Sequence, residues 1–564
     1  MKYKIAQLRD LIIKQGLYGY IIPTSDEFLN EYPPLSNRRL EFISGFNCSN
    51  GYLVVCVDRI VFITDSRYTH AAKEYFAENE IYDLKNIRTI FSALKTSGNF
   101  GYNPKLFSST NLSIFEELVL QIIDSDLVDQ IWANKPPPPA TTPFIYQEEY
   151  SGESSASKIQ KLREFIDSNN AKAMMIFAPE SVCWLLNIRA YDSEFSPIML
   201  SHMYVDLDRV VLFTAKRDLT CLSEMMIEVQ NLEEVENFCT KLEHKILVPA
   251  DSSIYLQSKI PHDLRILTQD PILLMRALKD SKEIMGAKNA HILDAISVIE
   301  FLTWLEDNVY GLDEYELGIK ITELRAQHPS YLMDSFAPIV GFNANGSKTH
   351  YRASKQNCSK VQKEGLLLID SGAHYLGGTT DITRTVAIGK PAQEHKINYT
   401  NVLKGHIALA NIKFPEGIKG GHLDILARQY LWNNGKDYGH GTGHGVGNCL
   451  SVHEGPASIS LYSLKYGLRE NMIFSNEPGY YQNGDFGIRI ENLQFVTNSQ
   501  YPGFLEFEQL TLVPYCSHLI DFDLINKDEL TYLSNYYRKI YDTTYNLLSN
   551  KAKKYLVKEL GVFL

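Results

Sequence analysis

The sequence is short of cysteine, of basic residues and of long apolar runs, and each shortage argues against a class of protein. Only eight of the 564 residues are cysteines and none forms a Cys-x-x-Cys pair, so thiolate zinc sites and thioredoxin chemistry have no support. The 55 Lys and Arg residues are outnumbered by 67 Asp and Glu residues, and the net charge of −12 argues against a nucleic-acid partner. No apolar run approaches the roughly 20 residues of a membrane helix, so no membrane partner is expected.

The first residues predict an amphipathic helix rather than a secretory signal. Ile5, Leu8, Ile12 and Ile13 recur at helical spacing with charged residues between them, and a strand pattern follows at residues 18–23. The expected location of the protein is therefore the cytoplasm.

Length and two seams predict three domains. At about 100–200 residues per domain, 564 residues correspond to roughly three. Pro136–Pro139 form a stiff connector, because four prolines can continue neither a helix nor a central strand. A second seam at residues 279–281 precedes a long predicted helix. The expected domains are residues 1–135, 136–280 and 281–564.

Helical and strand patterns alternate on both sides of the proline seam, which is typical of an α/β fold. Strand patterns stand at residues 18–23, 52–57, 59–64, 171–178 and 208–214, and a helical pattern stands at 158–169. The helix after residue 281 carries one apolar stripe, made of Ile292, Ile296, Ile299, Leu302 and Leu305. His291 lies beside this stripe and is expected to be a surface or cap residue.

Three segments in the last third of the chain combine glycine with acidic or histidine residues. In LLLIDSGAHYLGGTTDITRT, an apolar strand runs into Asp370 and a second strand starts at Asp381 after a Gly-Gly turn. The segment GHGTGHGVGNCLSVHEG contains His440, His444 and His453. In IFSNEPGYYQNGDFGIRIEN, two strands flank an Asn-Gly turn, with acids at the positions Glu477 and Glu491.

The charge of these segments points to a metal site. Burying a carboxylate costs several kcal/mol unless a cation compensates it. Two divalent ions balance the four negative charges of Asp370, Asp381, Glu477 and Glu491, and His444 adds a neutral nitrogen ligand. This oxygen-rich set suits manganese, cobalt, iron or zinc rather than copper.

Each segment alone also fits a simpler interpretation. The first fits a hairpin with solvated ends, the second a flexible loop, and the Arg489–Glu491 part of the third an Arg–Glu pair on a strand. The glycine run lacks the G-x-G-x-x-G spacing of a dinucleotide loop. All three segments in this order favour the metal site.

The same motifs resemble those of the pita-bread metallopeptidases of family M24, the fold of methionine aminopeptidase, prolidase and aminopeptidase P. The runs LIDSGAHYLGGTTDITRT, HGTGHGVG, VHEGP, EPGYY and GIRIEN look like aminopeptidase P of the long, three-domain cytosolic type. The resemblance covers the whole chain and is strongest from Ser335 to Pro514, with weaker matches such as RRLEFISGF and WLLNIRAYD. It implies two creatinase-type α/β domains followed by a pita-bread catalytic domain.

The resemblance also implies roles for individual residues. Metal ligands fall on Asp370, Asp381, His444, Glu477 and Glu491, with Asp381 and Glu491 bridging two ions, which the family leads us to expect as Mn²⁺, with Co²⁺ or Zn²⁺ as alternatives. Catalytic roles fall on His440, His453 and Glu477, and substrate binding on Arg67, His350, His440 and His453. Arg489 is expected to orient a metal-binding carboxylate. Arg67 also fits a plain surface ion pair with the preceding Asp65.

The implied reaction releases the N-terminal residue from peptides with proline in the second position. A hydroxide that bridges the two metal ions is expected to attack the scissile carbonyl. A homodimer is the expected assembly. Two alternatives are a prolidase that cuts only X-Pro dipeptides and a non-catalytic peptide-binding or protein-binding pita-bread module.

Overall fold

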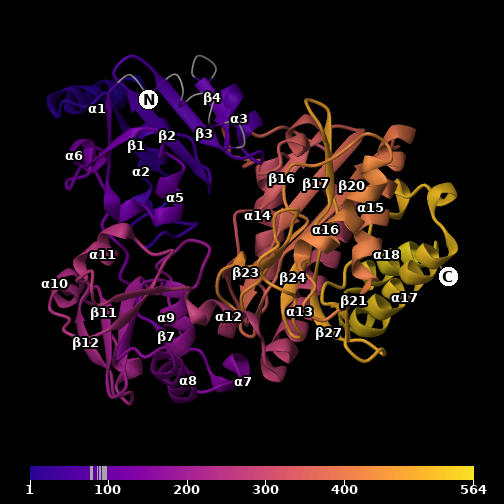
Figure 1. Ribbon diagram of the computed structural model, residues 1–564. Helices are drawn as coiled ribbons and strands as arrows, with labels where there is room; N and C mark the ends of the chain where they lie inside the picture. The colour runs from indigo at the N-terminus through magenta and orange to yellow at the C-terminus, as the bar shows by residue number, and fades with distance from the viewer. Residues whose placement is uncertain (77–79, 85–86, 88–90, 92–93, 95–97, 564) are drawn as a thin grey trace. The chain divides into compact units, whose positions relative to one another are not determined.

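The computed structural model describes residues 1–563 except 77–79, 85–86, 88–90, 92–93 and 95–97. The chain forms two compact units (Figure 1): the first comprises Met1–Glu148 and Glu153–Ile272, and the second Glu149–Gly152 and Leu273–Leu564. The division into three domains at residues 135 and 280 stays a prediction.

The first unit contains two six-stranded mixed sheets. The first sheet has the order β4-β3-β2-β1-β5-β6, with the strands β1 (Gly19–Pro23), β2 (Gly51–Cys56), β3 (Ile60–Thr64), β4 (Glu80–Asp83), β5 (Asn99–Tyr102) and β6 (Val119–Ile122). The second has the order β12-β11-β10-β8-β13-β14, with the strands β8 (Ala173–Ile176), β10 (Ser201–Asp206), β11 (Val210–Thr214), β12 (Glu228–Asn231), β13 (Ile246–Pro249) and β14 (Arg265–Thr268).

The two sheets share one pairing pattern. In each, three consecutive strands of the sheet pair antiparallel, as β1-β2-β3 and as β8-β10-β11. Parallel strands extend both sides of this trio. The five strand patterns named from the sequence coincide with β1, β2, β3, β8 and β11. These five strands are buried along their whole length, as their continuous apolar runs require.

Short helices accompany these strands in the first unit. They are α1 (Lys2–Lys14), α2 (Arg39–Ser44), α3 (Thr69–Tyr75), α5 (Ser109–Ser113), α6 (Leu127–Ile131), α8 (Ser155–Ser168), α9 (Pro179–Leu186), α10 (Glu234–Thr240) and α11 (Ile254–Lys259). The predicted amphipathic α1 buries Ile5, Leu8 and Ile12, whereas Ile13 is 59% exposed.

The second unit is built from further sheets and from the longest helices. Its sheets are β15 (Tyr331–Asp334)-β18 (Ala373–Tyr375)-β19 (Gly378–Thr379), β16 (Ile339–Phe342)-β17 (Gly365–Ser371)-β20 (Ile382–Ile388), β21 (Lys413–Pro415)-β28 (Phe504–Gln509)-β27 (Asn492–Asn498)-β24 (Ile473–Asn476)-β22 (Gly443–Gly445)-β23 (Glu454–Ile459) and β25 (Gly479–Gln482)-β26 (Phe486–Arg489). Its helices include α13 (Ser281–Asn308), α14 (Glu314–Arg325), α15 (Gln393–Ala410), α16 (Gly420–Trp432), α17 (Lys527–Thr544) and α18 (Asn550–Leu560).

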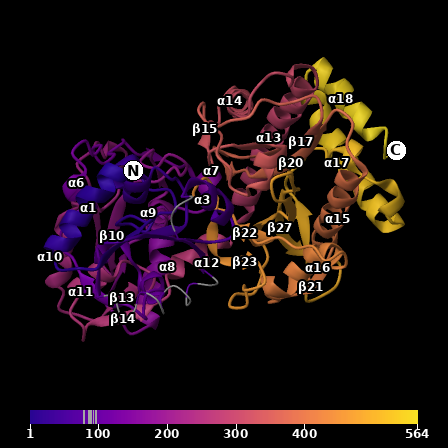
Figure 2. The same ribbon diagram turned by 90° about the horizontal axis from the view of Figure 1, so that it is seen from above.

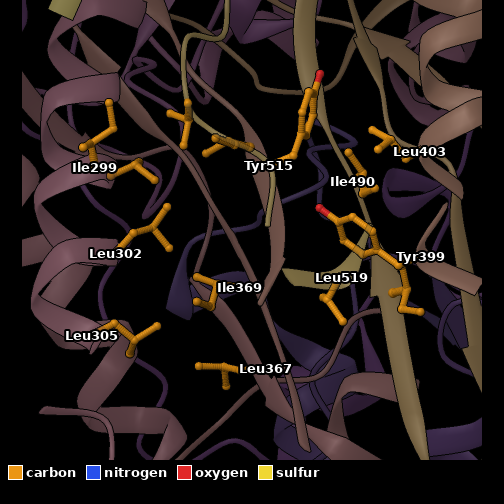
Figure 3. Close-up of a cluster of buried hydrophobic side chains, with 14 of the residues drawn as sticks. Ile299, Leu302, Leu305, Leu367, Ile369, Tyr399, Leu403, Ile490, Tyr515 and Leu519 are labelled. Atoms are coloured by element: carbon orange, nitrogen blue, oxygen red, sulfur yellow. The ribbon is translucent and has the colours of Figure 1, made fainter. Parts of the chain in front are cut away.

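The core of the second unit lies between helices and the β17–β20 hairpin. The predicted stripe of α13 faces this hairpin, and Figure 3 shows Ile299 and Leu302 opposite Ile369 of β17. Tyr399 and Leu403 of α15 belong to the same buried cluster. Burying these side chains holds the hairpin that carries two of the predicted metal ligands.

His291 of α13 is not at the surface, which corrects the sequence prediction. It is 3% exposed, and its Nδ1 donates a hydrogen bond to the Ala287 carbonyl oxygen at 2.7 Å. The single-stripe pattern was misleading because α13 contacts several elements, including β19, α14, α17 and α18, and is therefore covered on more than one face.

The last helices of the chain, α17 and α18, lie beside α13 (Figures 1 and 2). Their capping residues, Asn526 and Ser549, accept hydrogen bonds from the first turn of each helix. Within the described part of the chain, every helix is too short or too polar to cross a membrane.

Candidate metal centre

The β17–β20 hairpin brings Asp370 and Asp381 to the same end of two neighbouring strands. Asp370 pairs across the ladder with Thr383, and Asp381 stands two residues before Thr383. Residues two apart on a strand point to the same face. The two aspartates are 7% and 4% exposed, so both carboxylates are buried.

His444 is held on a strand that glycines make possible. It is the middle residue of β22, between Gly443 and Gly445. A Cβ on Gly443 would lie 2.0 Å from the Ser475 carbonyl oxygen, and one on Gly445 would lie 2.2 Å from the Glu454 carbonyl oxygen. The glycine-rich motif therefore lets the backbone of β22 approach its neighbours closely.

Glu477 and Glu491 enter the same region from two strand ends. Glu477 directly follows β24, and Glu491 lies between β26 and β27. The Thr383 hydroxyl donates a hydrogen bond to Glu491 Oε2 at 2.7 Å. Glu491 is 1% exposed.

Three of the four predicted acidic ligands lie close to the His444 ring. The His444 Nε2 atom lies 3.4 Å from Asp381 Oδ2 and 3.6 Å from Glu477 Oε1. Asp381, His444 and Glu491 each offer one ligand atom within 4.8 Å of the others. The Nδ1 atom of His444 donates to the Gly445 carbonyl oxygen at 2.9 Å, which leaves the Nε2 lone pair free to bind a cation.

The carboxylates raise one another's pKa. Burial, followed by the carboxylates of Asp370 and Glu477, raises the pKa of Asp381 well above its usual range. Burial and the Asp381 carboxylate do the same to the pKa of Glu491. Burial and the Glu491 carboxylate raise the pKa of Glu477 to about 8.

Two carboxylate oxygens of the cluster are buried among the described residues without a hydrogen-bond donor, Oδ1 of Asp370 and Oδ1 of Asp381. A buried acceptor of this kind is costly unless a cation or a proton satisfies it. Four acids and one imidazole nitrogen are hard ligands suited to divalent ions. The residues present therefore fit a metal centre.

A hydrogen-bonded chain runs along one side of the carboxylates. Arg489 donates to Asp370 Oδ2 at 2.6 Å, to the Thr383 hydroxyl at 3.1 Å and to the Tyr481 hydroxyl at 2.6 Å. The Tyr481 hydroxyl lies 2.8 Å from His440 Nε2. Arg489 thus contacts a carboxylate, as expected. Thr383 and Tyr481 were missed from the sequence, although both lie in the quoted motifs, because nothing in the pattern separates them from neighbouring polar and aromatic residues.

The other predicted functional residues lie at three kinds of position. His440 Nδ1 is 3.9 Å from Glu477 Oε2, and the His453 ring centre is 4.4 Å from that of His444, so both histidines border the carboxylates. His350 is half-buried after the β16 strand. Arg67 lies in the first unit, where it forms two hydrogen bonds with Asp65, and its contact with substrate stays a prediction.

Comparison with known proteins identifies the family of this chain. Residues 286–498 match "Metallopeptidase family M24", residues 4–130 and 134–283 match two "Creatinase/Prolidase N-terminal domain" families, and residues 503–561 match "C-terminal region of peptidase_M24". The chain is 34% identical to Xaa-Pro aminopeptidase 1 of Dictyostelium discoideum, over 95% of this chain and 92% of the relative. The chain belongs to the Xaa-Pro aminopeptidases of family M24.

Solved structures agree with this family assignment. An X-prolyl aminopeptidase from Caenorhabditis elegans, described as a cytosolic enzyme with a di-nuclear active site, has a TM-score of 0.94 and 28% identity, with 99% of each chain covered. A prolidase from Pyrococcus horikoshii has a TM-score of 0.53 and 25% identity, and it covers 64% of this chain. These matches confirm the family that the sequence motifs resemble. They also confirm the predicted fold, in which creatinase-type α/β domains are followed by a pita-bread domain.

Proposed function

We propose that this chain is a metal-dependent aminopeptidase that releases the N-terminal residue from peptides with proline in the second position. The observation that carries the proposal is the convergence of three acids, Asp381, Glu477 and Glu491, on His444, in a chain that matches a di-nuclear X-prolyl aminopeptidase over its whole length. The peptide, rather than a nucleic acid or a membrane, is the partner.

Five residues would hold two divalent ions. They are Asp370, Asp381, His444, Glu477 and Glu491. Two such ions supply Lewis acidity and a nucleophile at neutral pH. Mn²⁺ is the ion that we propose, with Co²⁺ and Zn²⁺ as alternatives, because the ligand set is rich in oxygen.

The chain's own residues handle protons and orientation. Glu477 carries a proton toward the proline nitrogen that leaves. His453 stabilises the carbonyl oxygen of the scissile bond, and His440 helps to bind the substrate. His350 shapes the pocket around proline, and Arg67 contributes to substrate binding.

Proline in the second position explains why a dedicated site is needed. The X-Pro amide has no N–H and a ring-locked φ angle. A peptidase that orients its substrate through that N–H finds no donor, so the site must select the bond by shape and by the free terminal amine.

We also propose the arrangement of the whole protein. Residues 1–135 and 136–280 form creatinase-like domains, and residues 281–564 form the catalytic domain, a division supported by the ranges of the family matches. A cytoplasmic location is supported by the description of the Caenorhabditis elegans relative as cytosolic. The active assembly is a homodimer.

The test is hydrolysis of Arg-Pro-Pro by metal-free protein before and after Mn²⁺ is added. We expect free arginine only with metal, and a loss of about 10²–10⁴-fold in Glu477→Ala. Glu506→Ala is the matched control, because Glu506 is a partly exposed partner of Lys413 on β21. Arginine release that persists without metal or in Glu477→Ala would refute the mechanism.

The second candidate is a prolidase, favoured by the match to the Pyrococcus horikoshii enzyme. Cleavage of Arg-Pro but not of Arg-Pro-Pro would move the assignment to a dipeptidase. No cleavage of either peptide, despite bound Mn²⁺, would favour a non-catalytic peptide-binding module.

A further inference from the structure

Arg384 lies at the centre of a buried hydrogen-bond network beside Glu491. It is 2% exposed and directly follows Thr383, whose hydroxyl binds the Glu491 carboxylate. Its Nη1 donates to the carbonyl oxygens of Glu491 at 2.7 Å and of Thr383 at 2.9 Å. Arg384 therefore holds the backbone at both ends of the hydrogen bond between Thr383 and Glu491.

The rest of the Arg384 guanidinium contacts the chain that follows β28. Nε donates to the Pro514 carbonyl oxygen at 2.9 Å, and Nη2 donates to the Val513 carbonyl oxygen at 2.8 Å. Nη2 also donates to Asn492 Oδ1 at 2.8 Å and to the Tyr536 hydroxyl at 3.3 Å. The planar guanidinium thus joins the Glu491 strand end to the C-terminal region.

Tyr536, on helix α17, connects to this network through a single hydroxyl. Its oxygen accepts from Arg384, from Asn492 Nδ2 at 3.2 Å and from the Val513 amide at 3.3 Å. Its proton is donated to the carbonyl oxygen of Val513 at 2.9 Å or of Thr511 at 3.1 Å. The side chain is 4% exposed, so water cannot readily replace these bonds.

We propose that Tyr536 is a positioning residue for the Glu491 carboxylate, through Arg384 and Asn492. Helix α17 thereby fixes the backbone around Glu491, which would hold the metal ions, and Tyr536 itself contacts neither substrate nor metal. Outer contacts of this kind orient ligands and raise metal affinity. The inference rests on the proposed metal-dependent function.

Tyr536→Phe and Tyr537→Phe form a matched pair for the test. Tyr537 is the next residue of the same helix, is fully buried, and donates its hydroxyl to the Tyr515 carbonyl oxygen at 2.9 Å. Each variant removes one buried hydroxyl, but only Tyr536 contacts Arg384 and Asn492. Calorimetric titration of the full-length, metal-free chain with Mn²⁺ would give the affinity, and urea unfolding without metal would give the stability.

We expect Tyr536→Phe to bind Mn²⁺ about 10-fold more weakly and Tyr537→Phe to bind it within about twofold of wild type, at similar stability losses. Arg384→Lys should weaken binding at least as much as Tyr536→Phe, because lysine lacks the planar fork. Unchanged affinity in Tyr536→Phe, or equal losses in the two tyrosine variants, would overturn the positioning role. A wild type that binds Mn²⁺ but leaves Arg-Pro-Pro intact would instead overturn the proposed function, and the affinity difference would still support the positioning role.

Discussion

The direction of each hydrogen bond that links Arg489, Tyr481 and His440 is fixed, because the Gly441 carbonyl at one end can only accept and Arg489 at the other can only donate. The Gly441 carbonyl oxygen can only accept, so His440 Nδ1 donates to it at 2.7 Å. In the neutral ring, Nε2 then accepts from the Tyr481 hydroxyl. The Tyr481 oxygen is left to accept from Arg489, whose other donors hold Asp370 and Thr383. One hydroxyl thus sets the orientation of a predicted catalytic histidine relative to a predicted metal ligand.

Tyr481→Phe should lower kcat/KM for Arg-Pro-Pro by about 10–100-fold, since a buried hydrogen bond to a charged group is worth about 1.5–3 kcal/mol. Steady-state kinetics with saturating Mn²⁺ would measure the effect. Tyr480→Phe is the control, because the Tyr480 hydroxyl donates to Gln482 outside this chain of contacts. Equal rates in the two variants would contradict the role given to Tyr481.

At the scale of elements, the site depends on strands that approach one another unusually closely. β22 pairs with β23 on one side and with β24 on the other, and its glycines face backbone carbonyl oxygens of these two neighbouring strands. A side chain there would push His444 away from the carboxylates. The motif around His444 is therefore as much a packing requirement as a chemical one.

Gly443→Ala should destabilise the protein by about 1–3 kcal/mol, because its Cβ would meet the Ser475 carbonyl oxygen at 2.0 Å. Urea unfolding would measure this loss, and Mn²⁺ affinity should fall with it. Gly318→Ala, on helix α14, is the control. Its Cβ would find ordinary contacts 3.6 Å and 3.8 Å away, so the helix should be unaffected or slightly stabilised. A Gly443→Ala variant as stable as wild type would contradict this account of β22.

At the scale of the whole molecule, the carboxylate cluster links stability to pH and metal. The pKa values of Asp381, Glu477 and Glu491 are raised in the fold above their ordinary acidic range. The metal-free folded state therefore binds more protons than the unfolded state once the pH exceeds about 4. The cluster's contribution to the free energy of unfolding is largest at low pH and is lost as the pH rises toward about 8 and beyond.

We expect added Mn²⁺ to raise the melting temperature more at pH 8 than at pH 6. At the higher pH the ions relieve repulsion between ionised carboxylates, whereas at the lower pH they must displace protons. Differential scanning calorimetry with and without Mn²⁺ would measure both shifts. In Glu477→Gln, which removes the group with a pKa of about 8, the difference between the two pH values should shrink. A metal effect independent of pH in the wild type would contradict the linkage.

The local pattern was enough for much of the architecture. Apolar runs located five of the twelve strands in the two large sheets of the first unit, and the spacing of Ile299, Leu302 and Leu305 located the buried stripe of α13. The shared pairing pattern of the two sheets was not visible, because strand order depends on contacts between residues far apart in the chain. The predicted exposure of His291 was wrong for the same reason, because the sequence of a helix does not show how many other elements pack around it.

The sequence by itself determined which residue types make up the site, namely acids at strand ends and histidines among glycines. The buried negative charge of the acids requires cations. Only the tertiary structure decided which other side chains form hydrogen bonds to these residues and to the backbone around them. Tyr481 reaches His440 across 41 residues, and Tyr536 reaches Arg384 across 152 residues. Hydrogen bonds over such separations form only after packing has fixed the backbone, so no local pattern predicts them.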